Sequence, residues 1–172
     1  PEPVSDDTLR QLYDLLKWGP TAFNSTPARF AFVRTPEARA RLLGCVSPGN
    51  VAKIQQAPVT VIIGMDMAFF ETMAPLAPHF DAQGFFTGNP GAVQPTAFRN
   101  SSLQGGYLIL AARALGLDCG PMSGFDAAKM DEAFWAGTAV KTNFICTLGK
   151  GDPAQVRPRQ ARRAFDEACR LL

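Results

Sequence analysis

The sequence is poor in the residues that usually carry acid–base or metal chemistry. His79 is the single histidine in 172 residues, so a Ser-His-Asp or Cys-His catalytic arrangement would depend entirely on it. The four cysteines lack Cys-x-x-Cys spacing, and neither a His-Glu-x-x-His motif nor an acidic calcium loop occurs. These absences argue against a zinc site, a calcium site and a disulfide framework, and free cysteines fit a reducing cytoplasm.

Strong net charge and long hydrophobic runs are also missing. The formal net charge is only +2, which argues against a nucleic-acid partner. The longest apolar runs, such as residues 59–65, are too short to span a bilayer, and no signal peptide is seen. We therefore expect a soluble protein without a membrane partner. Because the chain opens on Pro1 rather than Met, we expect that upstream residues, and with them part of a site, are missing.

The composition that remains is that of a folded protein. With 47% hydrophobic and 19% charged residues, the chain can bury a substantial core, and a single domain over residues 1–172 is expected. Its elements are predicted from periodicity and from turn residues. Helices are expected from residue 5 to about 18 and over 36–43, 50–56, 96–115 and 126–135, and strands over 30–34, 59–63 and 139–149.

Residues 68–95 fit neither period. Several phenylalanines lie there among glycines and prolines, and we expect a partly helical lid or excursion rather than core. The order of elements has no strict strand–helix–strand repeat and no G-x-G-x-x-G, so the predicted fold class is α+β rather than a dinucleotide-binding Rossmann domain.

Two glycine-rich segments have alternative interpretations. Residues 117–126 form a short extended segment that breaks into a turn at Gly120, Pro121 and Gly124. Such a turn lets backbone N–H groups approach a flat ligand, but it could equally be an ordinary connection. Within the helix over 96–115, Gly105 and Gly106 permit close helix packing, either across a dimer interface or inside a monomer. With so little acid–base equipment, the chain favours chemistry supplied by a bound cofactor.

Four segments taken together resemble the FMN-dependent nitroreductase family: 19–27, 50–53, 120–125 and the arginine-rich C-terminal end. Within it, the chain is most similar to the RutE/HadB-like branch, the malonic semialdehyde reductases. That finer resemblance rests on residues 17–21, 96–102, 120–126 and 165–169. It implies a nitroreductase-like α+β fold, with a mainly antiparallel sheet flanked by helices. It also implies an intertwined homodimer with FMN at the subunit interface.

The resemblance also implies site residues. Pro20, Thr21 and Asn24 match the loop that reaches FMN from the partner subunit, and Asn50 and Lys53 match contacts to the pyrimidine edge of the flavin. The flavin face and N5 would be met by Pro121, Met122, Ser123 and Gly124, although many family members carry Glu where this chain has Ser123. Arg162, assisted by Arg159, would hold the phosphate, since guanidinium groups donate paired hydrogen bonds.

The implied activity is ping-pong hydride transfer from NADH or NADPH through flavin N5, with no catalytic protein side chain. Malonic semialdehyde is the expected substrate, with Arg29 or Arg99 as a guess for its carboxylate partner and phenylalanines as pocket walls, among them Phe70, Phe85 and Phe86. The alternatives are a broad nitro or quinone reductase, a non-catalytic flavin-binding dimer, and a cofactor-free interaction domain.

Overall fold

The fold is built on a four-stranded antiparallel sheet. The computed structural model describes residues 2–172, and its strands are β1 (Ala28–Val33), β2 (Val59–Asp66), β3 (Asp118–Met122) and β4 (Val140–Gly149), in the spatial order β1-β2-β4-β3. All three pairings are antiparallel, which confirms the α+β prediction. The first six residues of the central strand β2 are buried, as expected of a strand covered on both faces.

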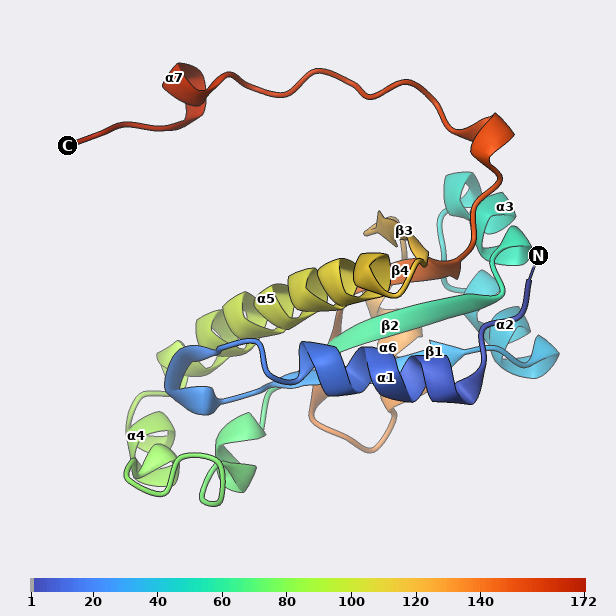
Figure 1. Ribbon diagram of the computed structural model, residues 1–172. Helices are drawn as coiled ribbons and strands as arrows, with labels where there is room; N and C mark the ends of the chain where they lie inside the picture. Colours follow the sequence, from blue (N-terminus) through green and yellow to red (C-terminus); the bar gives the residue numbers. More distant parts are fainter. Residues whose placement is uncertain (1) are drawn as a thin grey trace.

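Helices cover both faces of this sheet (Figure 1). On one face, α1 (Asp6–Leu16) and α5 (Val93–Ala114) pack over a core that includes Leu12, Val61 and Leu108. On the other face, α2 (Pro36–Leu43), α3 (Pro48–Gln56) and α6 (Ala127–Trp135) enclose a second core around Ile62. Alternate residues of β2 supply the two cores because successive strand side chains point to opposite faces.

The helix boundaries follow their capping residues. Ser5 and Thr35 accept hydrogen bonds from backbone N–H groups in the first turns of α1 and α2, and Asp126 does the same for α6. Helix α3 begins at Pro48 rather than at the expected residue 50, because proline is favoured in the first turn. Helix α5 begins at Val93, three residues before the expected start.

The excursion after β2 is partly helical, as predicted, but it also has a core of its own. It contains the short helices η2 (Phe69–Thr72), α4 (Ala82–Gly88) and η3 (Pro90–Ala92). Phe69 and Phe86 are buried there, together with Met73, and the two rings meet edge to face with centroids 4.8 Å apart. The expectation that this region contributes no core was therefore wrong, because its aromatic side chains pack against one another.

The chain after β4 leaves this body. Residues 150–172 contain only η4 (Pro153–Gln155) and α7 (Phe165–Ala168), and every residue of that segment is exposed. Figure 1 shows the segment running clear of the sheet and its helices. No helix in the described part of the chain is long and apolar enough to cross a membrane.

Candidate functional site

The N-terminal end of α3 is joined directly to the turn that follows β3. The carbonyl oxygen of Gly124 accepts hydrogen bonds from the Ser47 backbone N–H and from Asn50 Nδ2, both at 3.0 Å. Val46 and Phe125 add an isolated antiparallel bridge between the two segments. Two predicted site residues that are 74 positions apart, Asn50 and Gly124, are thus brought into contact.

Two side chains approach position 124 closely, which favours glycine there. A Cβ atom there would lie 2.8 Å from Asn50 Nδ2 and 3.2 Å from Ser47 Oγ, both closer than ordinary contact. The turn residue Ser123 is exposed, whereas Met122 has its side chain in the core beneath α6. Of these two, only Ser123 can offer a side chain to a ligand, and Met122 is limited to its backbone.

Lys53 lies three residues after Asn50 on α3, and its side chain is exposed. Residues three apart on a helix are neighbours on its surface. The structure therefore presents an amide, an ammonium group and a glycine turn on one side of the molecule, which is an arrangement suited to the polar edge of a planar ligand.

The loop between α1 and β1 is a second, strongly constrained unit. Phe23, Asn24 and Thr26 all have positive φ values, of 55°, 53° and 37°. Residues other than glycine rarely adopt positive φ, and those that do are often found at functional sites. Thr21 Oγ1 accepts from the Thr26 backbone N–H at 3.1 Å, and Asn24 Nδ2 donates to the Leu76 carbonyl at 2.9 Å.

One hydroxyl in this loop has no hydrogen-bond partner. Ser25 is 2% exposed, and its Oγ finds no donor or acceptor in the described residues. Buried polar atoms are almost always paired, so an orphan marks a position for a water or a ligand. The orphan hydroxyl and the close approach at Gly124 are the features of the two units that fit a polar planar cofactor.

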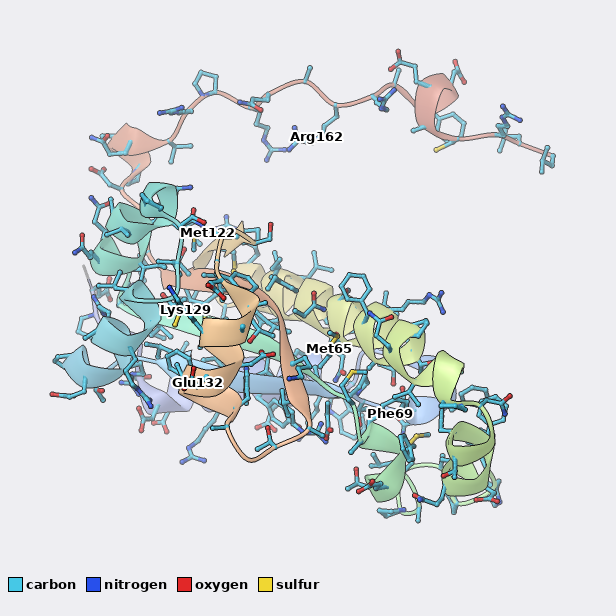
Figure 2. The ribbon with its side chains drawn as sticks, turned by 180° about the vertical axis from the view of Figure 1, so that it is seen from behind. Met65, Phe69, Met122, Lys129, Glu132 and Arg162 are labelled. Atoms are coloured by element: carbon cyan, nitrogen blue, oxygen red, sulfur yellow. The ribbon has the colours of Figure 1, made fainter. Side chains whose placement is uncertain are left out.

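The predicted arginines lie apart from these two units. Figure 2 shows Arg162 on the tail, separated from the body that carries Met122 and Lys129. Its guanidinium donates only to the neighbouring carbonyls of Gln160 and Ala161, at 3.1 Å each, and Arg159 is exposed on the same tail. The sequence-predicted cofactor residues therefore form separate groups within one chain.

The predicted substrate residues divide in the same way. Arg29 donates to Asp66 Oδ2 at 2.6 Å and to the carbonyls of Thr26 and Ala28, so its charge is already paired although 37% of its side chain is exposed. Arg99 is exposed on α5. Phe85 is 41% exposed, Phe70 is partly covered, and Phe86 is 1% exposed, so Phe86 is corrected from a pocket wall to a core residue.

The loop before β1 meets the excursion through aromatic contacts. Phe23 and Phe80 stack with centroids 4.4 Å apart, and Phe85 lies 5.5 Å from Phe80. Phe80 was absent from the predicted set because nothing in the sequence links it to the loop that contains Phe23.

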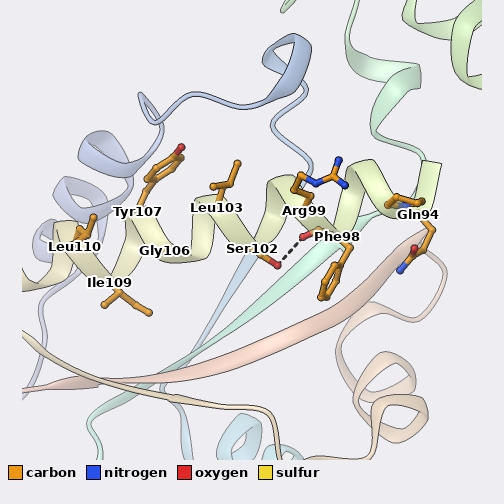
Figure 3. A pocket seen from close by; sticks show the side chains of 10 residues that line it. Gln94, Phe98, Arg99, Ser102, Leu103, Gly106, Tyr107, Ile109 and Leu110 are labelled. Atoms are coloured by element: carbon orange, nitrogen blue, oxygen red, sulfur yellow. Dashed lines mark hydrogen bonds between the residues drawn. The ribbon is translucent and has the colours of Figure 1, made fainter. Parts of the chain in front are cut away.

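The outer side of α5 forms a long apolar groove of about 880 Å³, lined by Phe98, Leu103, Tyr107 and Leu110 among others (Figure 3). Leu110 is 70% exposed, and Gly106 leaves the middle of the groove open. Such an extended apolar surface is typical of an interaction site.

The pKa values of two neighbouring cysteines are shifted in opposite directions, and the hydrogen bond with the Cys146 thiol lowers the pKa of Cys119. A hydrogen bond with the Cys119 thiol and burial together raise the pKa of Cys146 far above its usual range, so this thiol stays protonated. No group of three or more histidine, cysteine or acidic side chains is placed to hold a metal ion in residues 2–172.

Comparison with known proteins adds to this geometry. The model of the nitroreductase family matches residues 1–150. A Burkholderia lata protein named "Putative NADH dehydrogenase/NAD(P)H nitroreductase" is 60% identical over 170 residues, which are 99% of this chain and 87% of that protein.

Solved structures share the fold at lower identity. The Bacillus subtilis protein ydfN has a TM-score of 0.90 at 20% identity, over 100% of this chain and 90% of its own. A protein of Exiguobacterium sibiricum, solved in complex with FMN, has a TM-score of 0.86 at 18% identity, over 99% and 89% of the two chains. These likenesses confirm the predicted fold.

Proposed function

The chain belongs to the nitroreductase family, and from that premise we propose that it is an FMN-dependent NAD(P)H oxidoreductase that works as a homodimer. The observation that carries the proposal is the contact between Asn50 and the Gly124 carbonyl, which places a side-chain amide beside the glycine of the turn. The name of the Burkholderia lata relative and the FMN in the Exiguobacterium sibiricum structure support the same reaction class. FMN, when bound, takes up hydride from a reduced nicotinamide and passes it to an electrophilic substrate.

The side chains of this protein would bind and orient that group. Asn50 would meet the pyrimidine edge, and the positive charge of Lys53 would stabilise negative charge on the same edge. Pro121, Met122, Ser123 and Gly124 would lie along the ring face, mostly through their backbones. Arg159 and Arg162 would bind the phosphate, for which paired guanidinium donors are suited.

A second copy of the chain would complete the site. The groups that family resemblance assigns to one cofactor lie apart within a single chain, and the apolar groove on α5 remains uncovered. The exposed tail also carries the apolar residues Val156, Phe165, Leu171 and Leu172. Burial of their side chains against a partner would be favourable, because apolar surface is stabilised by removal from water. In the proposed dimer, Pro20, Thr21 and Asn24 of one subunit contact the flavin bound by the other. The C-terminal tail over residues 150–172 packs on the surface of the partner subunit.

For the substrate we propose malonic semialdehyde, which NAD(P)H and a proton convert to 3-hydroxypropanoate. This step belongs to pyrimidine degradation in the branch that the sequence resembles. Arg99 is the better carboxylate partner, because Arg29 is paired with Asp66. A single-domain protein in a reducing cytoplasm is part of the same proposal, supported by four free cysteines.

The exposed aromatic surface favours a second candidate, a broad nitro or quinone reductase. Phe23, Phe80 and Phe85 offer planar faces on which a planar acceptor could stack. This candidate shares the cofactor and the reductant with the first and differs from it only in the acceptor.

The test begins with the colour of the purified protein. Absorbance near ~450 nm, and its bleaching by NADH or NADPH, are expected of a flavin oxidoreductase. A protein that binds FMN but is not bleached would be a non-catalytic flavin-binding dimer, and a protein that binds no FMN would refute the whole proposal. Turnover on malonic semialdehyde and on a nitroaromatic then separates the two enzymatic candidates. If Arg99→Ala leaves the KM for the aldehyde unchanged, Arg99 is not its carboxylate partner.

A further inference from the structure

Three polar side chains of α5 hold the backbone of the loop over residues 20–28. Asn100 Oδ1 accepts from the Ala22 N–H at 2.8 Å, and Gln104 Oε1 accepts from the Ala28 N–H at 2.9 Å. Tyr107 Oη donates to the Pro20 carbonyl at 2.8 Å. One helix thus anchors both ends of the loop and a point between them.

The spacing of these three side chains places them in one stripe. Positions 100, 104 and 107 are separated by four and three residues, which are neighbours along one side of a helix. Asn100 and Gln104 are buried, and Asn100 also donates from Nδ2 to the Thr96 carbonyl of its own helix. The Tyr107 ring packs so closely over Gly19 that a Cβ atom there would overlap it.

The anchored loop is the strained one. Its residues with positive φ, Phe23, Asn24 and Thr26, all lie between the anchored positions Ala22 and Ala28. Strained backbone of this kind persists only where its surroundings determine it fully. The α5 side chains contribute to that determination through contacts to backbone groups, in addition to the hydrogen bonds of Thr21 and Asn24 within the loop and to the excursion.

We propose that Asn100, Gln104 and Tyr107 are positioning residues of the flavin site. They hold the loop in the conformation in which Thr21 and Asn24 are presented to the cofactor of the partner subunit. This inference rests on the proposed function. Helix α5 then has two roles. Its outer surface, with Phe98 and Leu110, forms the proposed subunit contact, and its stripe of polar side chains fixes the conformation of the loop that reaches the partner subunit.

The sharpest variant is Tyr107→Phe, which removes one oxygen atom from a side chain that keeps its ring over Gly19. We expect FMN binding to weaken by about two- to tenfold, the effect of one neutral hydrogen bond, with the dimer fraction unchanged. Asn100→Leu leaves the Ala22 N–H unpaired and should weaken FMN binding by about tenfold or more.

Rescue and control variants separate positioning from general stability. Asn100→Asp keeps an oxygen that can accept from the Ala22 N–H but loses the donor to the Thr96 carbonyl, so it should recover only part of the FMN affinity that Asn100→Leu loses. Ser101→Ala removes a buried hydroxyl from the same helix that contacts Phe98 and Asn143 but no residue of the loop, and it should leave FMN affinity unchanged.

Hydrogen exchange provides a readout that needs no cofactor. In Tyr107→Phe and Asn100→Leu, the amides of residues 20–28 should exchange faster, while those of β2 remain protected. Unchanged exchange and unchanged FMN affinity in a folded Tyr107→Phe dimer would overturn the inference, even if Asn100→Leu fails to fold. If the wild-type protein binds no FMN, the proposed function is refuted, and loop positioning is then decided by exchange alone.

Discussion

Replacing Asn50 by alanine should weaken FMN binding far more than it weakens the fold. Asn50 Nδ2 donates to the Gly124 carbonyl at 3.0 Å, but the Ser47 N–H donates to the same oxygen at the same distance. That carbonyl therefore keeps a partner after truncation, and the loss in unfolding free energy should be about 0.5–1 kcal/mol. For a chain of this length, this corresponds to a fall in Tm of roughly 1–4 °C.

The effect on binding should be larger because the amide does two jobs in the proposed site. The amide fixes the Gly124 turn and donates to the ligand. Its loss should weaken the free energy of FMN binding by about 1–3 kcal/mol, which raises the Kd roughly 5- to 150-fold. Titration of FMN into the apoprotein, followed by flavin fluorescence, measures the Kd, and thermal unfolding measures the Tm.

Gln56→Ala is the matched control, because Gln56 is exposed at the end of the same helix. It should leave both quantities unchanged. If Asn50→Ala binds FMN as tightly as the control variant does, the assignment of this corner of the molecule to the flavin is refuted. A fall in Tm far above 4 °C would show instead that Asn50 supports the fold.

Three further changes test the packing and the charge pairs. Phe86→Ala should lower the unfolding free energy by about 3–5 kcal/mol in chemical denaturation, because the ring is buried in the excursion core. Gly105→Ala should lower it by about 1–3 kcal/mol, because the added methyl overlaps the ring of Phe144 on β4. A hydrogen bond from Arg34 and its charge lower the pKa of Asp6, so the stabilising contribution of this pair is present above pH ~4 and is lost as the pH falls further. The Tm difference between wild type and Asp6→Asn should therefore disappear in strong acid.

Each of these variants has a neighbour that serves as a control. Phe85→Ala removes an adjacent but 41% exposed ring and should change stability much less than Phe86→Ala. Gly106→Ala meets no atom within 4 Å, so it should be neutral or stabilising through helix propensity. Asp7→Asn alters the same helical turn as Asp6→Asn, without breaking the pair with Arg34, and should leave the acid dependence intact. Equal effects within any of these pairs would contradict the packing or pairing described here.

Most of the sheet and its covering helices could be predicted from the sequence. Residues 36–43 are capped by Thr35 and opened by Pro36, and they form the predicted helix without a change of boundary. The central strand is recognised by its apolar run, although it continues to Asp66, three residues beyond the predicted end. Local signals were sufficient here because capping residues and strand periodicity act over a few neighbouring positions.

The candidate site was only partly accessible to the same reasoning. Family resemblance linked Asn50 with Gly124, and the structure brings them into contact, but it cannot say that Arg29 is paired with Asp66 or that Phe86 is buried. Those facts depend on tertiary packing between segments that are distant in the sequence. Long-range packing decides whether a charged or aromatic side chain is free to meet a ligand.

The polar stripe on α5 shows the limit most clearly. Asn100 and Gln104 lie on a long helix. Polar residues of a helix are usually assigned to the face that contacts solvent, opposite its apolar stripe. In the structure both are buried, and each finds its partner 76 or 78 positions earlier in the chain. Buried side-chain amides are kept where backbone groups need partners. Thr21 accepts from the N–H groups of Asn24 and Thr26 within the loop, whereas those of Ala22 and Ala28 donate to the amides on α5. A sequence can therefore reveal that such amides exist, but only the fold reveals which backbone they hold.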